Sequence, residues 1–112
     1  MASPDELWLV DFGDPYPGEP ASHRPALILG PSRLFGESLP FVIVAPLTTA
    51  YRGLSFHVEI EPNRANGLDL LSYVQCEMIR SISKRRLRTI LGVAEMNVSN
   101  SVKIVVERLL DY

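Results

Sequence analysis

The sequence predicts a mainly β, α+β fold, in which a small, strongly bent antiparallel sheet or barrel carries short helices and a C-terminal helix. Short apolar segments bounded by Gly and Pro predict five or six strands. Long loops connect several of them, and the C-terminal segment changes to helical spacing. The chain has 112 residues, a length typical of one domain, so residues 1–112 are expected to form a single domain.

The first half of the chain carries three predicted strands. Residues 6–12 are short, apolar and rich in strand formers. The Gly- and Pro-rich segment 13–24 cannot continue that strand and is expected to be a long loop. Residues 25–30 have the length of a buried strand. Residues 41–45 form a third apolar run, which Pro46 is expected to stop.

The second half carries the remaining strands. Residues 55–61 alternate between apolar and polar side chains, which predicts a half-buried strand with His57 on its exposed face. Residues 73–79 are predicted to form a fifth strand, with Cys76 in the core. A sixth strand is expected at residues 89–91, where Gly92 ends it.

Two helical segments are predicted. Ser83 can cap a short helical turn over residues 84–87. A helix is expected from about residue 95 to 110, and its apolar stripe must pack on the sheet, on a partner, or on both. That stripe consists of Val98, Val102, Val105, Val106, Leu109 and Leu110.

Composition restricts the class of protein. With a single cysteine the chain cannot form an internal disulfide, which fits a reducing compartment. The acidic N-terminus lacks the order of a signal peptide, and no apolar run approaches the ~18 residues of a membrane span. We therefore expect a cytoplasmic protein with no membrane contact. The two histidines and the cysteine are widely spaced, so no metal site is expected.

Charge is unevenly distributed along the chain. The net charge is −2, yet basic residues are dense between Arg80 and Arg88. This basic segment could be a phosphate track, part of a subunit contact or simply a solvated turn, and the sequence does not choose among them.

The segment Glu19-Pro-Ala-Ser-His23-Arg24 places an acid, an imidazole and a guanidinium before an apolar strand. Arg24 offers a fixed charge and a donor fork matched to phosphate, while His23 and Glu19 can move or orient a proton. Together they could serve phosphodiester cleavage; an ordinary polar loop is the alternative interpretation.

A pair of threonines, Thr48 and Thr49, follows the third predicted strand. If residues 25–30 and 41–45 pair as antiparallel neighbours, the start of one strand meets the end of the other, and Arg24 and Thr48 share one sheet edge. A guanidinium and a hydroxyl there could hold one phosphate. The alternative is a threonine that only closes its own turn.

Five segments in register resemble the MazF/PemK family of toxin endoribonucleases. Trp8-Leu-Val-Asp-Phe12 looks like its first strand, and Gly18-Glu19-Pro-Ala-Ser-His23-Arg24-Pro25-Ala is similar to its G-S-E-x-x-x-x-R-P-[AV] signature. Residues 42–48, 56–60 and 77–82 match later segments, so the resemblance covers nearly the whole chain.

The resemblance implies an SH3-like small β-barrel of the MazF/PemK/CcdB type that forms a homodimer. It implies metal-independent, sequence-specific cleavage of single-stranded RNA by attack of the ribose 2′-hydroxyl, with no cofactor, and control by a small acidic antitoxin of the MazE kind. The family's catalytic arginine and threonine fall on Arg24 and Thr48. His23 and Glu19 match positions that assist proton transfer or orientation.

Five further residues are expected to contact RNA. Tyr51 could stack on a base, although it could equally pack on its own loop, and Arg52 could hold a phosphate. Phe12, at the end of its strand, is expected to border the site, together with Thr49 and Arg80. Met78 stands where many members of the family carry Gln, which alters the group available to read a base edge.

Two other functions are compatible with the predicted fold. A toxin that traps DNA gyrase shares it, so a non-nuclease toxin that binds a protein target is the main alternative. An SH3-like interaction module is the weaker one, because such peptide grooves need exposed aromatic side chains and the chain is only 8% aromatic. The retained pair Arg24 and Thr48 favours the enzyme.

Overall fold

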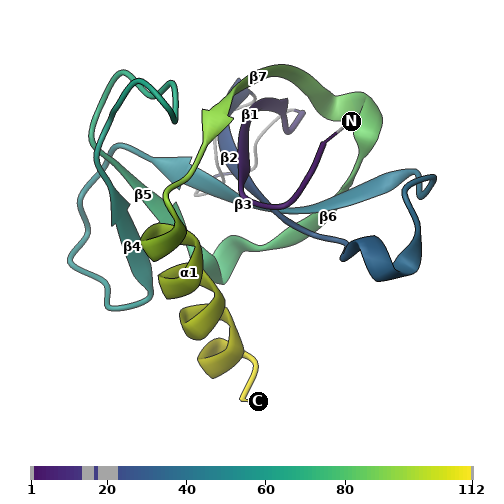
Figure 1. The fold of residues 1–112 in the computed structure, drawn as a ribbon. Helices are drawn as coiled ribbons and strands as arrows, with labels where there is room; N and C mark the ends of the chain where they lie inside the picture. Colours follow the sequence, from purple (N-terminus) through teal and green to yellow (C-terminus); the bar gives the residue numbers. More distant parts are fainter. Residues whose placement is uncertain (1, 14–16, 18–22, 112) are drawn as a thin grey trace.

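The computed structural model describes residues 2–13, 17 and 23–111. It contains one seven-stranded sheet and a C-terminal α-helix (Figure 1). The strands are β1 (Glu6–Asp11), β2 (His23–Gly30), β3 (Phe41–Thr48), β4 (His57–Ile60), β5 (Ser72–Gln75), β6 (Arg80–Ser83) and β7 (Leu87–Val93), and the helix is α1 (Met96–Leu109).

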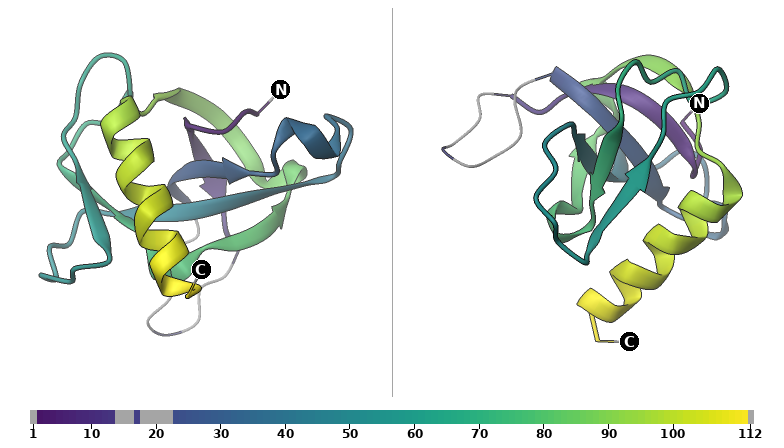
Figure 2. Two further views of the ribbon diagram at one scale, coloured as in Figure 1. Left: turned by 60° about the horizontal axis from the view of Figure 1, so that its bottom comes forward. Right: turned by 90° about the vertical axis from the view of Figure 1, so that its left-hand side faces the viewer.

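The sheet is antiparallel and strongly bent. Its order is β4-β5-β3-β2-β1-β7, and β6 pairs with β3 beside this path. The sheet bends strongly along its strand order in the views of Figures 1 and 2. Among the described residues no ladder joins β7 to β4 or β6, so the curled sheet is open rather than closed. The predicted α+β class, with a bent antiparallel sheet and a terminal helix, is confirmed.

The prediction that Pro46 stops the third strand was wrong, because β3 continues to Thr48. Along one edge of β3 the partner is β6 as far as Val44 and β5 from Leu47 onward. Pro46 lies in the gap between these two pairings, so neither needs its missing N–H. On the other edge Pro46 still pairs with Ala26 of β2.

The prediction of one strand over residues 73–79 was wrong beyond Gln75, where β5 ends; the next strand, β6, begins only at Arg80. A 3-10 turn at Cys76–Met78 separates β5 from β6. Both strands pair with β3, β5 near Thr48 and β6 from Phe41 to Val44. The turn therefore separates the segment that pairs with the end of β3 from the segment that pairs with its beginning. This break depends on the position of β3, which the apolar pattern of residues 73–79 does not contain.

Two other strands are longer than predicted. β2 begins at His23, because His23 and Arg24 pair with Asp11 and Val10 of β1 instead of belonging to a loop. β7 extends from Leu87 to Val93 through its pairing with β1. The short turn before it is confirmed: Lys84–Arg86 forms a 3-10 turn in which the N–H of Arg85 donates to Ser83 Oγ at 3.2 Å.

The predicted C-terminal helix is confirmed as α1. It packs against β4 and the 3-10 turn at Cys76–Met78, where Val98 and Val102 enter the core and Val105 and Val106 lie partly buried on it. The last turn leaves the sheet, so Leu109 and Leu110 are exposed (Figure 2). No helix in the described part of the chain is long and apolar enough to cross a membrane.

Candidate active site

The sheet brings Arg24 and Thr48 together. In the β2–β3 ladder Ala26 is paired with Pro46, and Arg24 and Thr48 each lie two residues beyond that pair, at the same end of the ladder. The antiparallel pairing assumed from the sequence is therefore present. Both residues line one hollow of about 240 Å³, called here the Arg24 hollow. Its lining is His23, Arg24, Pro25, Leu47, Thr48, Thr49 and Ser72.

The Arg24 hollow is suited to an anion. None of the described residues that line it is acidic. The Nε atom of Arg24 is buried and has no hydrogen-bond partner among the described residues. Burial, and then the positive charge of Arg52, lower the pKa of the Arg24 guanidinium. An anion in the hollow would offset this repulsion.

Thr48 closes its own turn and still offers a donor. Its side chain is buried at 7% exposure, and Oγ1 accepts the N–H of Ala50 at 3.2 Å. That bond uses an oxygen lone pair, so the hydroxyl proton remains to be donated. Sequence reasoning missed Ser72, which lies next to the Thr48–Tyr73 pair and donates its own hydroxyl to the carbonyl of Leu70 at 2.9 Å.

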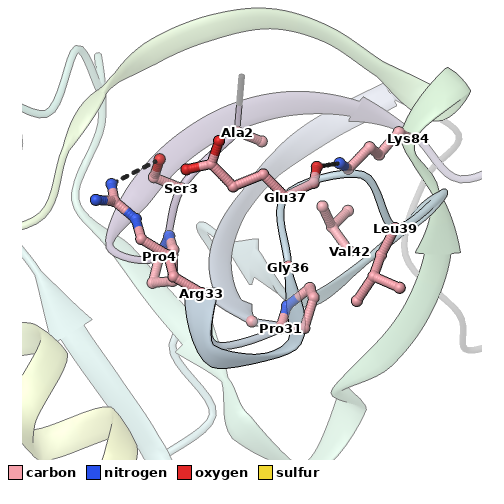
Figure 3. Close-up of a pocket in the computed structure, with 11 residues that line it drawn as sticks. Ala2, Ser3, Pro4, Pro31, Arg33, Gly36, Glu37, Leu39, Val42 and Lys84 are labelled. Carbon is pink, nitrogen blue, oxygen red and sulfur yellow. Dashed lines mark hydrogen bonds between the residues drawn. The ribbon is translucent and has the colours of Figure 1, made fainter.

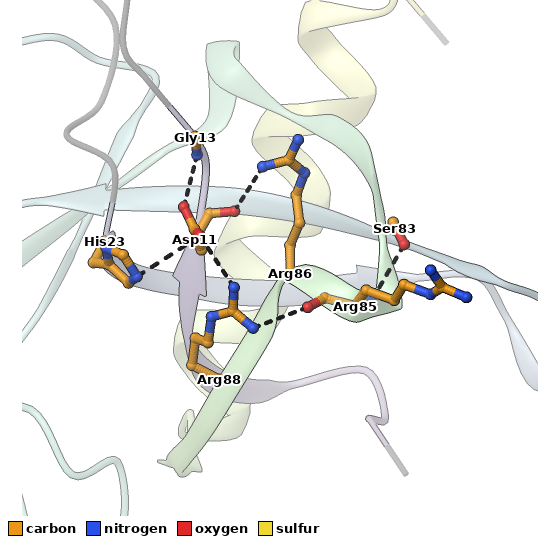
Figure 4. A network of polar contacts seen from close by, with 7 residues as sticks. All are labelled: Asp11, Gly13, His23, Ser83, Arg85, Arg86 and Arg88. Atoms are coloured by element: carbon orange, nitrogen blue, oxygen red, sulfur yellow. Dashed lines mark hydrogen bonds and ion pairs between the residues drawn. The ribbon is translucent and has the colours of Figure 1, made fainter.

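A polar network centred on Asp11 lies beside His23 (Figure 4). Asp11 Oδ2 is 3.1 Å from the Arg88 guanidinium and 3.8 Å from His23 Nε2. Asp11 Oδ1 accepts the N–H of Gly13 at 2.8 Å, and the Asp11 carbonyl accepts from Arg86. The Gly13 N–H first, and Arg88 second, lower the pKa of the Asp11 carboxyl. The sequence did not predict this network. The one feature near Asp11 that points to it is that this carboxylate stands at the end of a strand.

Several side chains of the basic segment, residues 80–88, make contacts within the chain itself. Besides the Asp11 contacts, Lys84 Nζ donates to the carbonyl of Glu37 at 3.0 Å. The Arg80 guanidinium lies 5.7 Å from the centre of the Phe12 ring. Phe12 is itself buried, so its ring is not presented for stacking on a base. Neither Phe12 nor Arg80 lines the Arg24 hollow.

A second hollow, of about 130 Å³ and called here the Tyr51 hollow, lies along the loop before β4. The Tyr51 ring is 76% exposed and lies 5.6 Å from the Tyr73 ring, tilted by 55°. Thus Tyr51 does pack on a neighbour while keeping much of its surface free. The lining is Tyr51, Arg52, Gly53, Leu54, His57, Glu59 and Tyr73.

The prediction that His57 is a surface residue was wrong. Its side chain is only 3% exposed, and Nε2 lies 3.0 Å from Glu77 Oε2. Because a carboxylate can only accept, Nε2 carries the proton of this bond. The Nδ1 atom is buried without a hydrogen-bond partner among the described residues. The alternation of residues 55–61 could not reveal this pair, since Glu77 comes from the turn after β5.

Glu19, a possible metal site and a third hollow remain to be placed relative to the Arg24 and Tyr51 hollows. Glu19 lies outside the described residues. Within the described part of the chain no group of three His, Cys, Asp or Glu side chains is placed to hold a metal ion. A third hollow, of about 100 Å³, lies between the N-terminus and the segment after β2, where Arg33 donates to Ser3 Oγ (Figure 3). It shares no residue with the Arg24 hollow.

Comparison with known proteins identifies the family. A family model described as "PemK-like, MazF-like toxin of type II toxin-antitoxin system" matches residues 4–110. The chain belongs to this toxin family. The sequence resemblance to MazF and PemK is thereby confirmed over nearly the whole chain.

Solved structures agree with the assignment of this MazF-like toxin. MazF from Deinococcus radiodurans has a TM-score of 0.82 at 24% identity, covering 99% of this chain and 97% of that one. The Mycobacterium tuberculosis toxin MazF-mt6 has a TM-score of 0.76 at 25% identity, covering 95% and 96%. A MazE–MazF complex from D. radiodurans has a TM-score of 0.70 at 26% identity, covering 96% and 91%.

Proposed function

We propose that this MazF-like toxin is an endoribonuclease that cleaves single-stranded RNA at short sequence motifs. The observation that carries the proposal is the Arg24 hollow. Its lining includes Arg24, whose buried Nε has no hydrogen-bond partner among the described residues, and Thr48, and none of the described lining residues is acidic. A negatively charged phosphodiester supplies what these groups lack. Mycobacterial proteins of the same fold are described as endoribonucleases, which supports the same activity here.

The proposed chemistry is an internal transfer that needs no cofactor. The ribose 2′-oxygen attacks the adjacent phosphorus, the bond from phosphorus to the 5′ oxygen breaks, and a 2′,3′-cyclic phosphate forms. Negative charge grows on the non-bridging oxygens in the transition state. The Arg24 guanidinium and the Thr48 hydroxyl stabilise that charge, and a preorganised donor of this kind is typically worth about 3–4 kcal/mol.

Proton transfer is assigned to His23. The 2′-hydroxyl must lose a proton as it attacks, and the 5′ oxygen must gain one as it leaves. His23 lines the Arg24 hollow, is half exposed and lies beside the Asp11 carboxylate. It is thus the lining side chain suited to accept a proton. Glu19 keeps its proposed assisting role on the strength of the family signature alone.

The proposed partners are a second copy of the chain, a MazE-like antitoxin and RNA in the cytoplasm. The complex of the D. radiodurans relative with MazE supports an antitoxin. The 112 residues would act as one domain, with apolar surface left for partners. That surface includes Leu34, Phe35, Leu109 and Leu110, all exposed. An acidic, partly disordered antitoxin could cover such apolar and basic surface by folding on it.

The deciding experiment is cleavage of a mixed RNA pool by purified protein in EDTA, with RNA ends mapped and Arg24→Ala beside it. We expect cuts at a short motif that leave cyclic phosphate and 5′-hydroxyl ends, and their loss in the variant. A folded protein that cuts no RNA would overturn the proposal and favour a toxin acting on a protein such as gyrase, which a DNA supercoiling assay would then test.

A further inference from the structure

The Tyr51 hollow adjoins the Arg24 hollow across a single pair of sheet residues. Thr48 of β3 is paired with Tyr73 of β5, and Thr48 lines the Arg24 hollow while Tyr73 lines the Tyr51 hollow. Arg52 lines the Tyr51 hollow, and its charge acts on Arg24. A phosphate held by Arg24 would therefore have the Tyr51 hollow beside it.

The loop side of the Tyr51 hollow offers a stacking surface. Tyr73 supports one side of the exposed Tyr51 ring. Gly53 adopts a φ of 65°, and a Cβ there would stand 3.4 Å from Tyr51 Oη, so the loop turns back tightly against the tyrosine. A supported aromatic ring stacks on any of the four bases, which gives affinity without sequence preference.

The strand side of the hollow offers a selective group. Among the described residues of the lining, Glu59 supplies the one carboxylate, and this side chain is exposed. A carboxylate accepts hydrogen bonds and donates none. Adenine, cytosine and guanine each present an amino group as a donor, whereas uracil presents two carbonyl oxygens around its N–H and repels a carboxylate.

The buried His57 side chain, which also lines the Tyr51 hollow, is held in place by Glu77. The His57 ring is almost fully buried and held by Glu77 through its Nε2. Phe56 also lies edge-on to it, with ring centres 5.5 Å apart. Because His57 is the residue two before Glu59 in β4, this anchoring also fixes the strand that presents Glu59.

We propose that the Tyr51 hollow binds the base of a nucleotide next to the scissile phosphate, with Tyr51 stacked on the ring and Glu59 accepting from its amino group. This inference rests on the proposed endoribonuclease function. It makes Glu59 a specificity-determining residue, and it requires uracil to be disfavoured at one position beside the cut.

The test uses the full chain and short RNAs that carry the mapped motif, with each nucleotide beside the cut replaced in turn by the other three. The wild type is expected to favour amino-bearing bases over uracil at one position by about tenfold in kcat/KM. Glu59→Gln should reduce that preference to less than about threefold, because an amide both donates and accepts. Glu61→Gln is the matched control, since Glu61 lies two residues along and does not line the hollow.

Tyr51 is tested separately. Tyr51→Ala should lower kcat/KM for all base variants by about tenfold, while Tyr51→Phe should retain it, because stacking needs only the ring. Binding of 2′-deoxy oligonucleotides, followed by fluorescence anisotropy, should weaken in parallel without depending on catalysis.

The outcomes separate the two proposals. Cleavage by the wild type with an unchanged base preference in Glu59→Gln would overturn the assignment of the Tyr51 hollow and leave the nuclease intact. The assignment would also be overturned if the wild type, Glu59→Gln and Glu61→Gln all discriminated equally against uracil and against the other non-cognate bases. Absence of any cleavage would instead remove the proposed function, and the base site with it.

Discussion

Arg24 and Thr48, far apart in the sequence, each lie two residues beyond the Ala26–Pro46 pair of the β2–β3 ladder and line one hollow, whose described lining contains no acidic side chain. The arrangement follows from two strands that pair in antiparallel fashion and end at one edge. It leaves a buried guanidinium nitrogen without a partner among the described residues and places Arg52 close enough to lower the pKa of Arg24. Such an arrangement costs stability unless an anion occupies it.

Replacing Arg24 should separate activity from stability. Arg24→Met keeps much of the side-chain length and removes the charge, so we expect kcat to fall by about 10²–10³-fold. The free energy of unfolding should stay the same or rise, because an unpaired buried N–H and the repulsion from Arg52 both disappear. RNA cleavage and urea unfolding of the two proteins measure these effects. A variant less stable by more than about 1 kcal/mol would contradict the claim that Arg24 is strained without an anion.

The hydroxyl of Thr48 should matter more than its methyl group. Thr48→Val removes both the acceptor for the Ala50 N–H and the donor proposed for the phosphate, so kcat should fall by about 10–100-fold. Thr48→Ser keeps the hydroxyl and should retain most activity. The comparison is made on one RNA under single-turnover conditions. Equal losses in the two variants would show that packing, not the hydroxyl, is what the position supplies.

The sequence predicted the elements of the sheet better than their boundaries. Local patterns located every strand except β6, because apolar runs bounded by Gly and Pro mark strands directly. The predicted strand ends were wrong where β3 has two partners along one edge. Pro46 does not end β3, because it lies between the two pairings, and the run at residues 73–79 leaves the sheet after Gln75 and forms a turn before β6. Such offsets depend on a neighbouring strand, which no single segment of sequence contains.

The candidate site was predictable only where it lies on paired strands. Arg24 and Thr48 followed from an assumed pairing of two segments, and the structure contains that pairing. His57 was misjudged because its partner Glu77 belongs to a turn that the sequence pattern hid. The Asp11 network could not be foreseen either, since Arg86 and Arg88 reach it from the far end of the chain.

Asp11 should make stability depend on acid pH. Its pKa is lowered in the folded state, so its contribution is present above the unfolded pKa and is lost as pH falls through the folded pKa. Asp11→Asn should therefore be less stable than the wild type near neutral pH, and the difference should shrink toward about pH 3. Urea unfolding at both pH values measures it. Asp69→Asn, at an exposed aspartate outside the Asp11 network, should show no such pattern.

Cys76 should be unreactive in the folded protein. Burial first, and the charge of Glu77 second, raise the pKa of its thiol to about 11. Near neutral pH the thiolate fraction is then about 100-fold below that of a free cysteine, and burial limits access further. We expect iodoacetamide to modify the native protein far more slowly than glutathione, and the unfolded protein at the free-thiol rate. Rapid labelling of the native protein would show that the turn at residues 76–78 opens readily.

The close packing of the loop before β5 on β7 should depend on glycine at position 67. Gly67 has a φ of 68°, and a Cβ there would collide with the Leu91 carbonyl, a backbone atom that cannot rotate away. Gly67→Ala should lower the free energy of unfolding by about 2–4 kcal/mol, since strain and collision add. Gly36→Ala is the matched control, because Gly36 also has a positive φ but nothing lies within 4 Å of its Cβ position. It should cost only about 1 kcal/mol, so similar losses in both variants would assign the effect to backbone conformation alone.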